Sequence, residues 1–312
     1  MDKVKQLFVK YGTAISLFVL IGIVSAINPK FLTMYNILNI FRQVSIIGLI
    51  AFGMTFVIIT GGIDLSVGAT LALTSMIMGL MLVKGTSDLV AIPVALLLGV
   101  IFGGINGVLI SKVKLQPFIA TLATMTMFRG ITMIISNGIP AMELTKKSSI
   151  LNFFSQGKIL NIPFPMILLI VFLVVLLLLL QNTVFGRGVY AVGGNEEAAR
   201  LSSIPVNKVK ILVYVVSGFM SALAGVILTS RLSSAQPTAG IGFELDAIAA
   251  VVIGGTSLSG GKGKIFGTFL GVLIIGVLNN GLNIIGVSAF YQQFIKGLVI
   301  LLAVILDRKS NT

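Results

Sequence analysis

Long apolar runs separated by short polar connections fill most of this sequence, and this pattern restricts the fold more than any other feature. Hydrophobic residues make up 56% of the 312 positions and charged residues only 10%, against about 25% in soluble domains. Because about 20 apolar helical residues cross the core of a bilayer, the pattern predicts an all-α, polytopic integral membrane protein with about ten transmembrane helices. The runs lie at roughly 12–27, 45–60, 65–83, 89–110, 117–136, 163–181, 209–230, 244–259, 265–285 and 289–306.

Composition also excludes several classes of function. The net charge is +13, but the basic residues are scattered at the ends of apolar runs and form no basic face, so we expect no nucleic-acid binding. The chain has no cysteine and no histidine, which removes thiolate nucleophiles, Cys/His metal sites and imidazole acid/base chemistry. We therefore expect neither a metal nor a cofactor.

The distribution of basic residues predicts the orientation, because Lys and Arg accumulate on the cytoplasmic side of a membrane. With a cytoplasmic N-terminus, that side carries Lys3, Lys5, Lys10, Lys112, Lys114, Arg187, Arg200, Lys208, Lys210, Lys262, Lys264, Arg308 and Lys309. The other side carries the smaller set Lys30, Arg42, Lys84, Lys146, Lys147, Lys158 and Arg231. Both termini and the 182–208 loop are thus predicted to be cytoplasmic. No cleavage pattern of small residues follows the first run before Asn28, so we interpret this run as a retained span.

Some segments depart from simple spans. The runs at 45–60 and 244–259 are short and end at glycine pairs, so we expect broken or re-entrant segments near 61–68 and 254–263. These two octets resemble each other, but both fall on the predicted cytoplasmic side, which does not fit a simple inverted repeat. Residues 32–44 have apolar positions at helical spacing and predict an interfacial helix on the outer side. Residues 137–162 predict an outer hairpin or cap.

The polar 182–208 loop is the best indication of function. Asn195 is a good helix N-cap, and Glu196 and Glu197 suit the positive end of the turn that follows. Ala198, Ala199 and Arg200 continue this pattern, Leu201 adds an apolar edge, and Pro205 stops it, which predicts a two-turn helix at about 196–204. Such a helix is either a solvated connection or a coupling helix that seats in a groove on an ATPase subunit.

Ionisable residues within or beside spans are site hypotheses, since they are costly in a membrane. Asp64 follows a glycine pair at a predicted helix break, where it either lines a translocation path or caps the next helix. Arg129 lies inside a span and either pairs with a carboxylate or reaches an interface. Glu244 and Asp246 open the 244–259 run, where they either suit a helix N-terminus or form part of a gate. For Lys296, in the last run, we expect pairing or an extended position toward the interface.

Two glycine-rich patterns bear on packing and on the energy source. Gly99, Gly103 and Gly107 form consecutive GxxxG steps, a spacing that allows close helix packing in lipid. The glycine-rich segment around Lys262 and Lys264 is out of register with the phosphate loop of ATPases. The energy source is therefore expected on another chain, or in an ion gradient, and the chain itself is not expected to be an enzyme.

Several segments together resemble the permeases of ribose ABC importers, the membrane subunits of binding-protein-dependent sugar transporters. They are Gly62–Gly68, Gln116–Leu122, Gly193–Leu201, Arg231–Gly240, Glu244–Ala249, the 254–263 loop and Leu278–Asn283. The resemblance covers essentially the whole chain and implies a single transmembrane permease domain over 1–312. It further implies a homodimeric pore, cytoplasmic ATPase subunits, an extracytoplasmic sugar-binding protein, a monosaccharide substrate and the cell membrane of a bacterium. The alternative from the residues alone is an ion-coupled secondary transporter or a passive channel, although the chain lacks the mid-span acids and histidines typical of ion relays.

Overall fold

A computed structural model describes the backbone of residues 2–311 and the side chains of residues 12–299, 301–302 and 304–305. Five basic residues that contribute to the predicted orientation, Lys3, Lys5, Lys10, Arg308 and Lys309, have side chains outside the described ones. The described chain is helical apart from connections and one small hairpin. Its elements in order are α1 Asp2–Ile27, η1 Pro29–Leu32, α2 Met34–Ile59, α3 Val67–Val83, α4 Asp88–Ser111, α5 Pro117–Ser136, α6 Leu144–Lys147, α7 Ser149–Gln156, β1 Lys158–Ile159, β2 Ile162–Pro163, α8 Phe164–Asn182, α9 Val184–Gly194, α10 Glu196–Leu201, α11 Val206–Leu232, α12 Phe243–Ile253, α13 Ile265–Ile285 and α14 Ala289–Asn311.

The all-helical prediction is confirmed, and each predicted apolar run overlaps one helix, although α2 begins well before its run and α12 ends before its run does. Six helices in the described part of the chain are long and apolar enough to cross a membrane by length and composition, namely α2, α4, α5, α8, α11 and α13. Residues 12–27 of α1 and helix α3 are shorter apolar helices. The predicted number of about ten crossings is therefore not confirmed.

The predicted interfacial helix at 32–44 is wrong, and so is the short second run, because a single 26-residue helix, α2, covers both. Thr33 caps its first turn by accepting a hydrogen bond from the backbone N–H of Asn36. Ile40 and Val44 are buried inside the bundle, where Val44 lies against Gly276 of α13. Buried Asn36 also exchanges two side-chain hydrogen bonds with Asn280, both 2.9 Å long. The apolar positions thus face a neighbouring helix and not the membrane interface.

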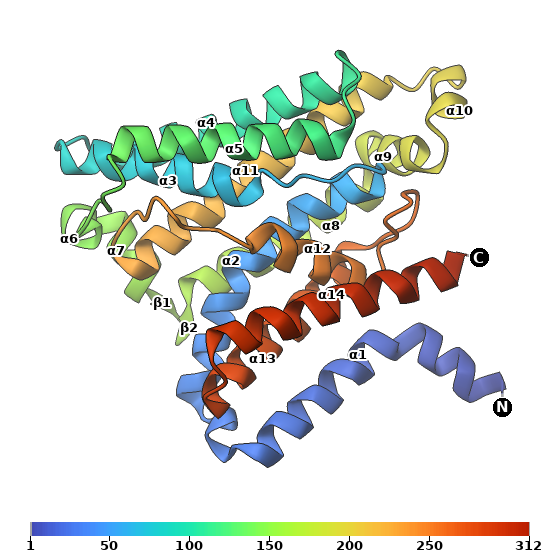
Figure 1. The fold of residues 1–312 in the computed structure, drawn as a ribbon, viewed down its shortest axis with the longest axis horizontal. Coiled ribbons are helices and arrows are strands. Elements are labelled where there is room, and N and C mark those ends of the chain that lie inside the picture. Colours follow the sequence, from blue (N-terminus) through green and yellow to red (C-terminus); the bar gives the residue numbers. More distant parts are fainter. Residues whose placement is uncertain (1, 312) are drawn as a thin grey trace.

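Helices α2 and α11 pack against each other in opposite directions through the centre of the bundle (Figure 1). Near one end, Arg231 of α11 donates a hydrogen bond to Asn39 of α2. Near the other end, Tyr214 of α11 donates to the carbonyl of Ile63, just beyond α2. The two helices are therefore antiparallel, and each begins a series of four helices, α2–α5 and α11–α14.

The two series repeat the same packing in inverted orientation. Helix α4 packs antiparallel on α11, and its counterpart α13 packs antiparallel on α2. The contacting pairs are Gly99 with Gly218, Gly107 with Ile211, Val44 with Gly276 and Thr55 with Thr268. The close glycine contacts confirm the packing role of the GxxxG spacing, since a Cβ on these residues would meet the partner helix. The fold therefore contains an inverted repeat of the kind found in transporters.

Each series also contains a broken region. Residues 60–66 connect α2 to α3 without helical structure, and residues 233–242 connect α11 to α12 in the equivalent place. The predicted breaks near 61–68 and 254–263 are thus present as non-helical connections. The similar octets, however, are not the repeat. Residues 61–68 enter a short helix, whereas residues 254–261 leave one.

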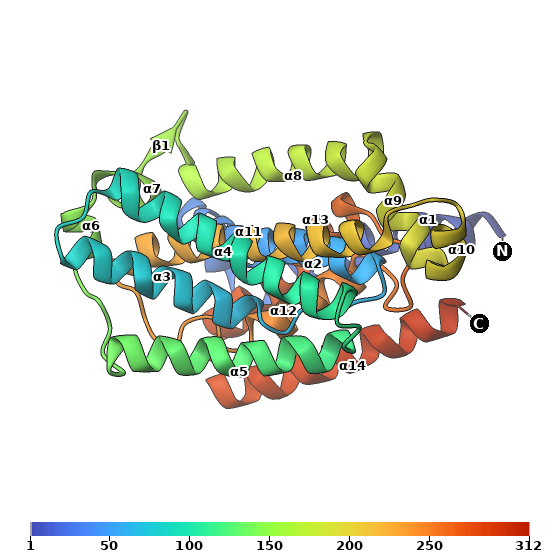
Figure 2. The ribbon, with the colours of Figure 1, turned by 90° about the horizontal axis from the view of Figure 1, so that it is seen from above.

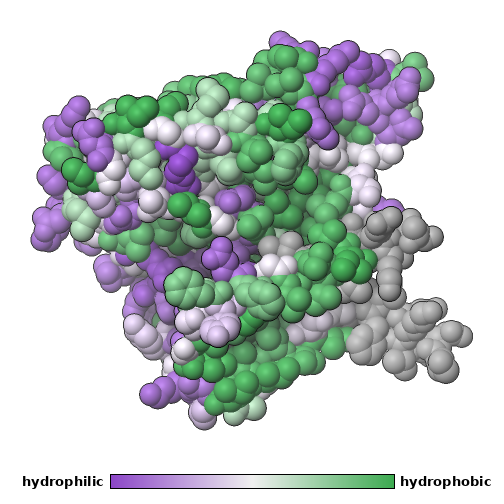
Figure 3. Space-filling model, in the orientation of Figure 1, coloured by the Kyte–Doolittle hydropathy of each residue, from purple (hydrophilic) through white to green (hydrophobic). Residues whose placement is uncertain are grey.

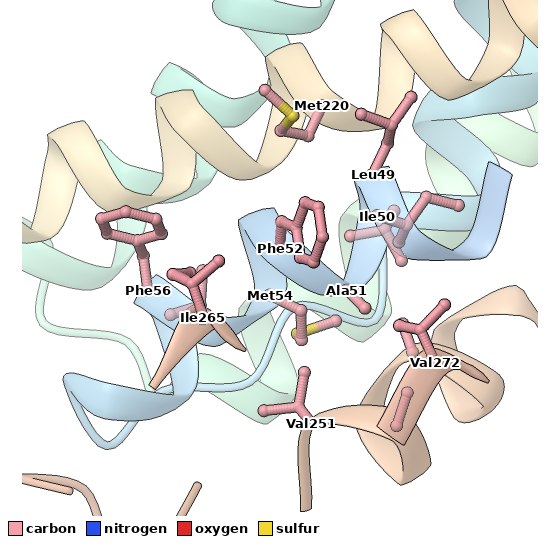
Figure 4. Packing of buried hydrophobic residues seen from close by; sticks show 14 of the residues in the cluster. Leu49, Ile50, Ala51, Phe52, Met54, Phe56, Met220, Val251, Ile265 and Val272 are labelled. Carbon is pink, nitrogen blue, oxygen red and sulfur yellow. The ribbon is translucent and has the colours of Figure 1, made fainter. Parts of the chain in front are cut away.

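The core lies where α2, α11, α12 and α13 meet, and Figure 4 shows Phe52, Met220, Val251 and Val272 converging there. On the outside, a hydrophobic band lies between hydrophilic ends of the bundle (Figure 3). This surface suits lipid contact. One hydrophilic end carries α6, α7 and the β1–β2 hairpin, in the 137–162 segment predicted as a hairpin or cap. The other end carries α10 together with the outer ends of α1 and α14 (Figures 1 and 2).

Candidate functional site

The proposed coupling helix is present as α10, and its first turn is capped as predicted. The Asn195 side chain accepts a 2.9 Å hydrogen bond from the backbone N–H of Ala198. The helix ends at Leu201, earlier than the predicted 204, and Ser203 follows with a positive φ of 61°. Pro205 stands at the N-cap of α11 and does not terminate α10. The 182–208 segment is thus largely helical, with α9 preceding α10.

Glu196 links α10 to α11 by an ion pair. Its carboxylate accepts from Arg200 at 3.1 Å on the same helix and from Lys210 at 2.5 Å on α11. The hydrogen bond from Lys210 is the largest cause that holds the pKa of Glu196 below its ordinary value. Glu196 therefore stabilises the position of the helix.

The exposed side chains of α10 include Glu197 and Leu201. Glu197 is exposed, and Leu201 is 84% exposed although it is a large apolar side chain. Ala199 instead faces the protein, where it is buried. The outer face of α10 thus exposes one carboxylate and one apolar side chain, while Ala199 and Glu196 contact the rest of the protein.

The second site lies in the middle of the bundle, where the N-terminal ends of α3 and α12 meet. A Cβ placed on Gly68 of α3 would overlap the carbonyl oxygen of Gly240, and would lie 2.9 Å from the Glu244 carboxylate. The Glu244 carboxylate also accepts a 3.2 Å hydrogen bond from the backbone N–H of Gly242. Glu244 therefore lies over the first turns of both short helices, where helix dipoles favour negative charge.

Asp64 lies in the first broken connection and is fully enclosed, with 1% of its surface exposed. One carboxylate oxygen accepts from the backbone N–H and hydroxyl of Ser66 at 3.0 and 2.6 Å. The other accepts from the Ser217 hydroxyl of α11 at 2.8 Å. Asn106 donates to Ser66, and Thr124 donates to Asn106, each at 2.8 Å. This chain of bonds joins α3, α4, α5 and α11 around Asp64 at the start of α3.

Arg129 bridges α5 to the second broken connection. Its guanidinium donates two hydrogen bonds of 2.8 Å to the carbonyl oxygens of Pro237 and Ala239. In the first connection, Thr121 and Tyr214 donate in the same way to the carbonyl of Ile63. A non-helical backbone inside a membrane needs such partners. Arg129 thus hydrogen-bonds to backbone carbonyls, and the described residues form no ion pair between it and a carboxylate, although Glu244 lines the same cavity.

Two cavities flank the start of α12, between α5 and α14. One has a volume of about 460 Å³ and is lined by Thr126, Arg129 and Glu244 among apolar residues. The other, of about 550 Å³, is lined by Asp246, Gln292, Gln293 and Lys296. Ile241 lies between them and lines both. Figure 2 places α5 and α14 on one face of the bundle, and Figure 3 shows hydrophilic residues reaching the middle of that face.

Asp246 and Lys296 form an ion pair of 2.9 Å in the second cavity, which accounts for the ionisable residue in the last run. Asp246 is 6% exposed, and Lys296 reaches it from α14. Of the ionisable residues singled out in the sequence, Arg129, Glu244 and Asp246 thus line these two adjoining cavities, which we call the trough, whereas Asp64 is enclosed. In the described residues, no three acidic, histidine or cysteine side chains form a cluster that could hold a metal ion.

Sequence reasoning missed the partners that surround these residues. Ser66, Asn106, Thr124 and Ser217 form the Asp64 network, and none was predicted as a site residue. Their signal was present, since an asparagine and small hydroxyl residues interrupt apolar runs where nothing in lipid can satisfy them. These side chains meet around Asp64 only because four helices pack together, and no local sequence pattern shows that packing.

Comparison with known proteins places this arrangement among transport proteins. The sequence model of a family described as branched-chain amino acid transport system / permease component matches residues 36–304. No solved structure matches the chain significantly.

Three curated relatives illustrate the similarity. The ribose import permease protein RbsC of Bacillus subtilis (strain 168) is 58% identical over 302 residues, which cover 97% of this chain and 94% of the relative. The protein of the same name from Haemophilus influenzae is 51% identical, with 99% and 96% covered. The L-arabinose transport system permease protein AraH of Escherichia coli (strain K12) is 40% identical, with 96% and 90% covered.

Proposed function

Since the chain belongs to the family of transport-system permease components, we propose that it is the membrane subunit of an ATP-driven importer for ribose. The relatives named for ribose share 49–58% of their residues with this chain, and the relative named for arabinose shares 40%. Similarity thus favours ribose over other monosaccharides. In this function the chain is a multi-pass protein of the bacterial cytoplasmic membrane and hydrolyses nothing itself.

Three partners complete the proposed importer. ATP hydrolysis requires a separate cytoplasmic subunit, since the glycine-rich segment around Lys262 lacks the spacing of a phosphate loop. A sugar-binding protein delivers ribose at the end that carries α6 and α7. A second copy of the chain packs over the trough between α5 and α14.

The coupling function rests on one observation, the outward face of α10. The Glu196 carboxylate already pairs with Arg200 and Lys210, so it is not available to a partner. Glu197 and Leu201 remain exposed on the same short helix. A carboxylate beside an apolar anchor on a fixed helix suits a groove on a soluble partner. We assign ATPase coupling to the segment Asn195–Leu201.

The proposed path for the sugar is the trough beside α12. The charges within it are balanced, since Asp246 pairs with Lys296, while Arg129 and Glu244 line the same cavity. Such groups offer hydrogen bonds to hydroxyls without selecting an ion. Apolar residues form the rest of the walls, as in most small-molecule sites. A neutral polyol fits this combination better than a charged solute.

Charge reversal on α10 tests the function. The complex is reconstituted in liposomes from this chain, its ATPase and its binding protein, and ribose uptake and ATP hydrolysis are measured. We expect Glu197→Lys to reduce uptake and ribose-stimulated hydrolysis together, by about tenfold or more, while the permease melts at the wild-type temperature. Glu197→Gln removes the charge without reversing it, so its uptake and hydrolysis rates should lie between those of the wild type and those of Glu197→Lys.

Two outcomes would overturn the proposal. Normal uptake and hydrolysis with Glu197→Lys would exclude coupling through this face of α10. Ribose uptake by liposomes that contain this chain alone, without ATP, would exclude the importer and favour an ion-coupled transporter or a passive channel.

A further inference from the structure

Three backbone segments from distant parts of the sequence meet at the end of α9, the helix that precedes α10. The backbone N–H of Gly261, in the loop after α12, donates a 2.9 Å hydrogen bond to the carbonyl of Ile59 at the end of α2. Gly193, at the end of α9, lies against both. A Cβ on Gly193 would overlap the Ile59 carbonyl oxygen and lie 2.7 Å from the Gly261 nitrogen. We name Ile59, Gly193 and Gly261 the glycine junction.

Side chains of α9 reinforce this junction on either side. The Tyr190 hydroxyl donates a 2.7 Å hydrogen bond to the carbonyl of Gly263, in the same loop. The rings of Phe185 and Phe56 stack with centroids 6.0 Å apart, which joins α9 to the last turn of α2. Helix α9 is therefore fixed to both α2 and the loop after α12, and it leads into α10 through Gly194 and Asn195.

Both elements held at the junction lead to the middle of the bundle. From Ile59, the chain passes through the broken connection to Asp64 within a few residues. From the loop after α12, the chain leads back along α12 to Glu244 and Asp246. This helix has 11 residues and is about 16 Å long. Gly261 lies in the loop that follows α12, and the hydrogen bond from the backbone N–H of Ser257 to the carbonyl of Lys262 closes this loop. A displacement at the junction thus reaches α12 through a closed loop and then passes along the helix to the trough.

The alternative connection from α10 to the bundle is weaker. It passes through the ion pair of Glu196 with Lys210, in which Glu196 is 44% exposed. Exposed ion pairs contribute little energy and rearrange easily. The glycine junction, by contrast, is a contact between backbones without room for a single methyl group, so it transmits displacement without slack.

We propose that the glycine junction transmits the movement of the ATPase-bound α10 to α12, with Gly193 as its positioning residue. The inference rests on the proposed function and deepens it, because it names the route by which closure of the ATPase opens or closes the trough. The junction is distinct from the docking face, since Glu197 and Leu201 lie on the next helix and point outward.

Neighbouring glycines provide the test. Gly193→Ala places a methyl group into the junction, whereas Gly194→Ala meets nothing within 4 Å. Neither residue has a positive φ, so alanine fits the backbone at both positions. In the reconstituted complex, we expect Gly193→Ala to assemble with the ATPase and hydrolyse ATP, but to transport about tenfold less ribose per ATP. Gly194→Ala should transport as the wild type does.

A second variant covers the case in which Gly193→Ala does not fold. Tyr190→Phe removes one hydroxyl and adds no atoms, and the tyrosine is only partly buried. We expect it to lower the ribose transported per ATP by about threefold while assembly is unchanged.

The outcomes separate the inference from the function on which it rests. Normal coupling in both Gly193→Ala and Tyr190→Phe would overturn the junction as the route. So would equal losses in Gly193→Ala and Gly194→Ala. If the wild-type complex itself transported no ribose with ATP, the proposed function would fail, whatever the variants did.

Discussion

The Asp64 network permits a quantitative prediction about the stability of the broken region. Ser217→Ala removes the donor to one carboxylate oxygen and leaves that oxygen without its bond in an enclosed site. A hydrogen bond to a charged group contributes about 1.5–3 kcal/mol, so we expect a loss of about 2 kcal/mol. Asp64→Ala also strands the Ser66 backbone N–H and hydroxyl, and we expect about 4 kcal/mol.

Thermal melting of the purified chain in detergent measures both losses. At about 2 °C per kcal/mol for a chain of this size, Ser217→Ala should melt about 4 °C lower and Asp64→Ala about 8 °C lower. Ser221→Ala is the matched control. Ser221 lies one turn further along α11, is equally buried, and donates only within its own helix, to the Ser217 carbonyl. This control should melt within about 2 °C of the wild type.

The double variant decides whether the hydrogen bond itself is the cause. Both single changes delete the same Asp64–Ser217 bond, so Asp64→Ala with Ser217→Ala should lose about as much as Asp64→Ala alone. Strictly additive losses would refute the reasoning, because the two side chains would then act independently. Equal melting of Ser217→Ala and Ser221→Ala would refute it as well, since packing alone would then explain the loss.

Two further predictions concern α10 and the helix packing. The pKa of Glu196 is lowered in the folded chain, so its stabilising effect is present above the ordinary carboxyl pKa and is lost as the pH falls through the folded value. Glu196→Gln should therefore melt slightly below the wild type at pH 7, by less than about 2 °C because the pair is exposed. The difference should shrink as the pH falls through the carboxyl range, and a difference that does not change with pH would contradict this origin. Gly103→Ala places a methyl group onto the Tyr214 carbonyl of α11 and should lower the melting temperature by about 4 °C or more. Gly104→Ala is the control, because its methyl group would lie 3.7 Å from the nearest atom and should leave the melting temperature unchanged. Equal melting temperatures of the two variants would contradict the close packing.

Features that depend on neighbouring residues could be predicted from the sequence, whereas features that depend on contacts between distant residues could not. The apolar runs, the capped helix after Asn195 and the close packing at Gly99, Gly103 and Gly107 follow from local spacing, and the structure contains all three. The interfacial helix at 32–44 failed because amphipathic spacing does not say what covers the apolar face. Here the cover is α13, more than 200 residues away in sequence.

The inverted repeat was hidden for a related reason. The most visible internal similarity joins residues 61–68 to 254–261, which occupy different places in the two series of helices. The true equivalents are the connections 60–66 and 233–242, which share little sequence because each is completed by different neighbours. One uses Thr121 and Tyr214, and the other uses Arg129. A non-helical backbone in a membrane needs hydrogen-bond partners, so the requirement falls on the side chains around it more than on its own residues.

The placement of the acidic residues follows from this broken architecture. The chain has nine acids, and three of them, Asp64, Glu244 and Asp246, lie at the facing N-terminal ends of α3 and α12. Each N-terminus carries unpaired N–H groups and a partial positive charge, and two such ends meeting in a membrane would repel each other. The carboxylates offset that repulsion, while Arg129 and Lys296 balance the carboxylates in turn. An ion relay is therefore not required to explain mid-bundle acids here. The same charges that stabilise the break also line the trough, so a shift of α12 alters both together.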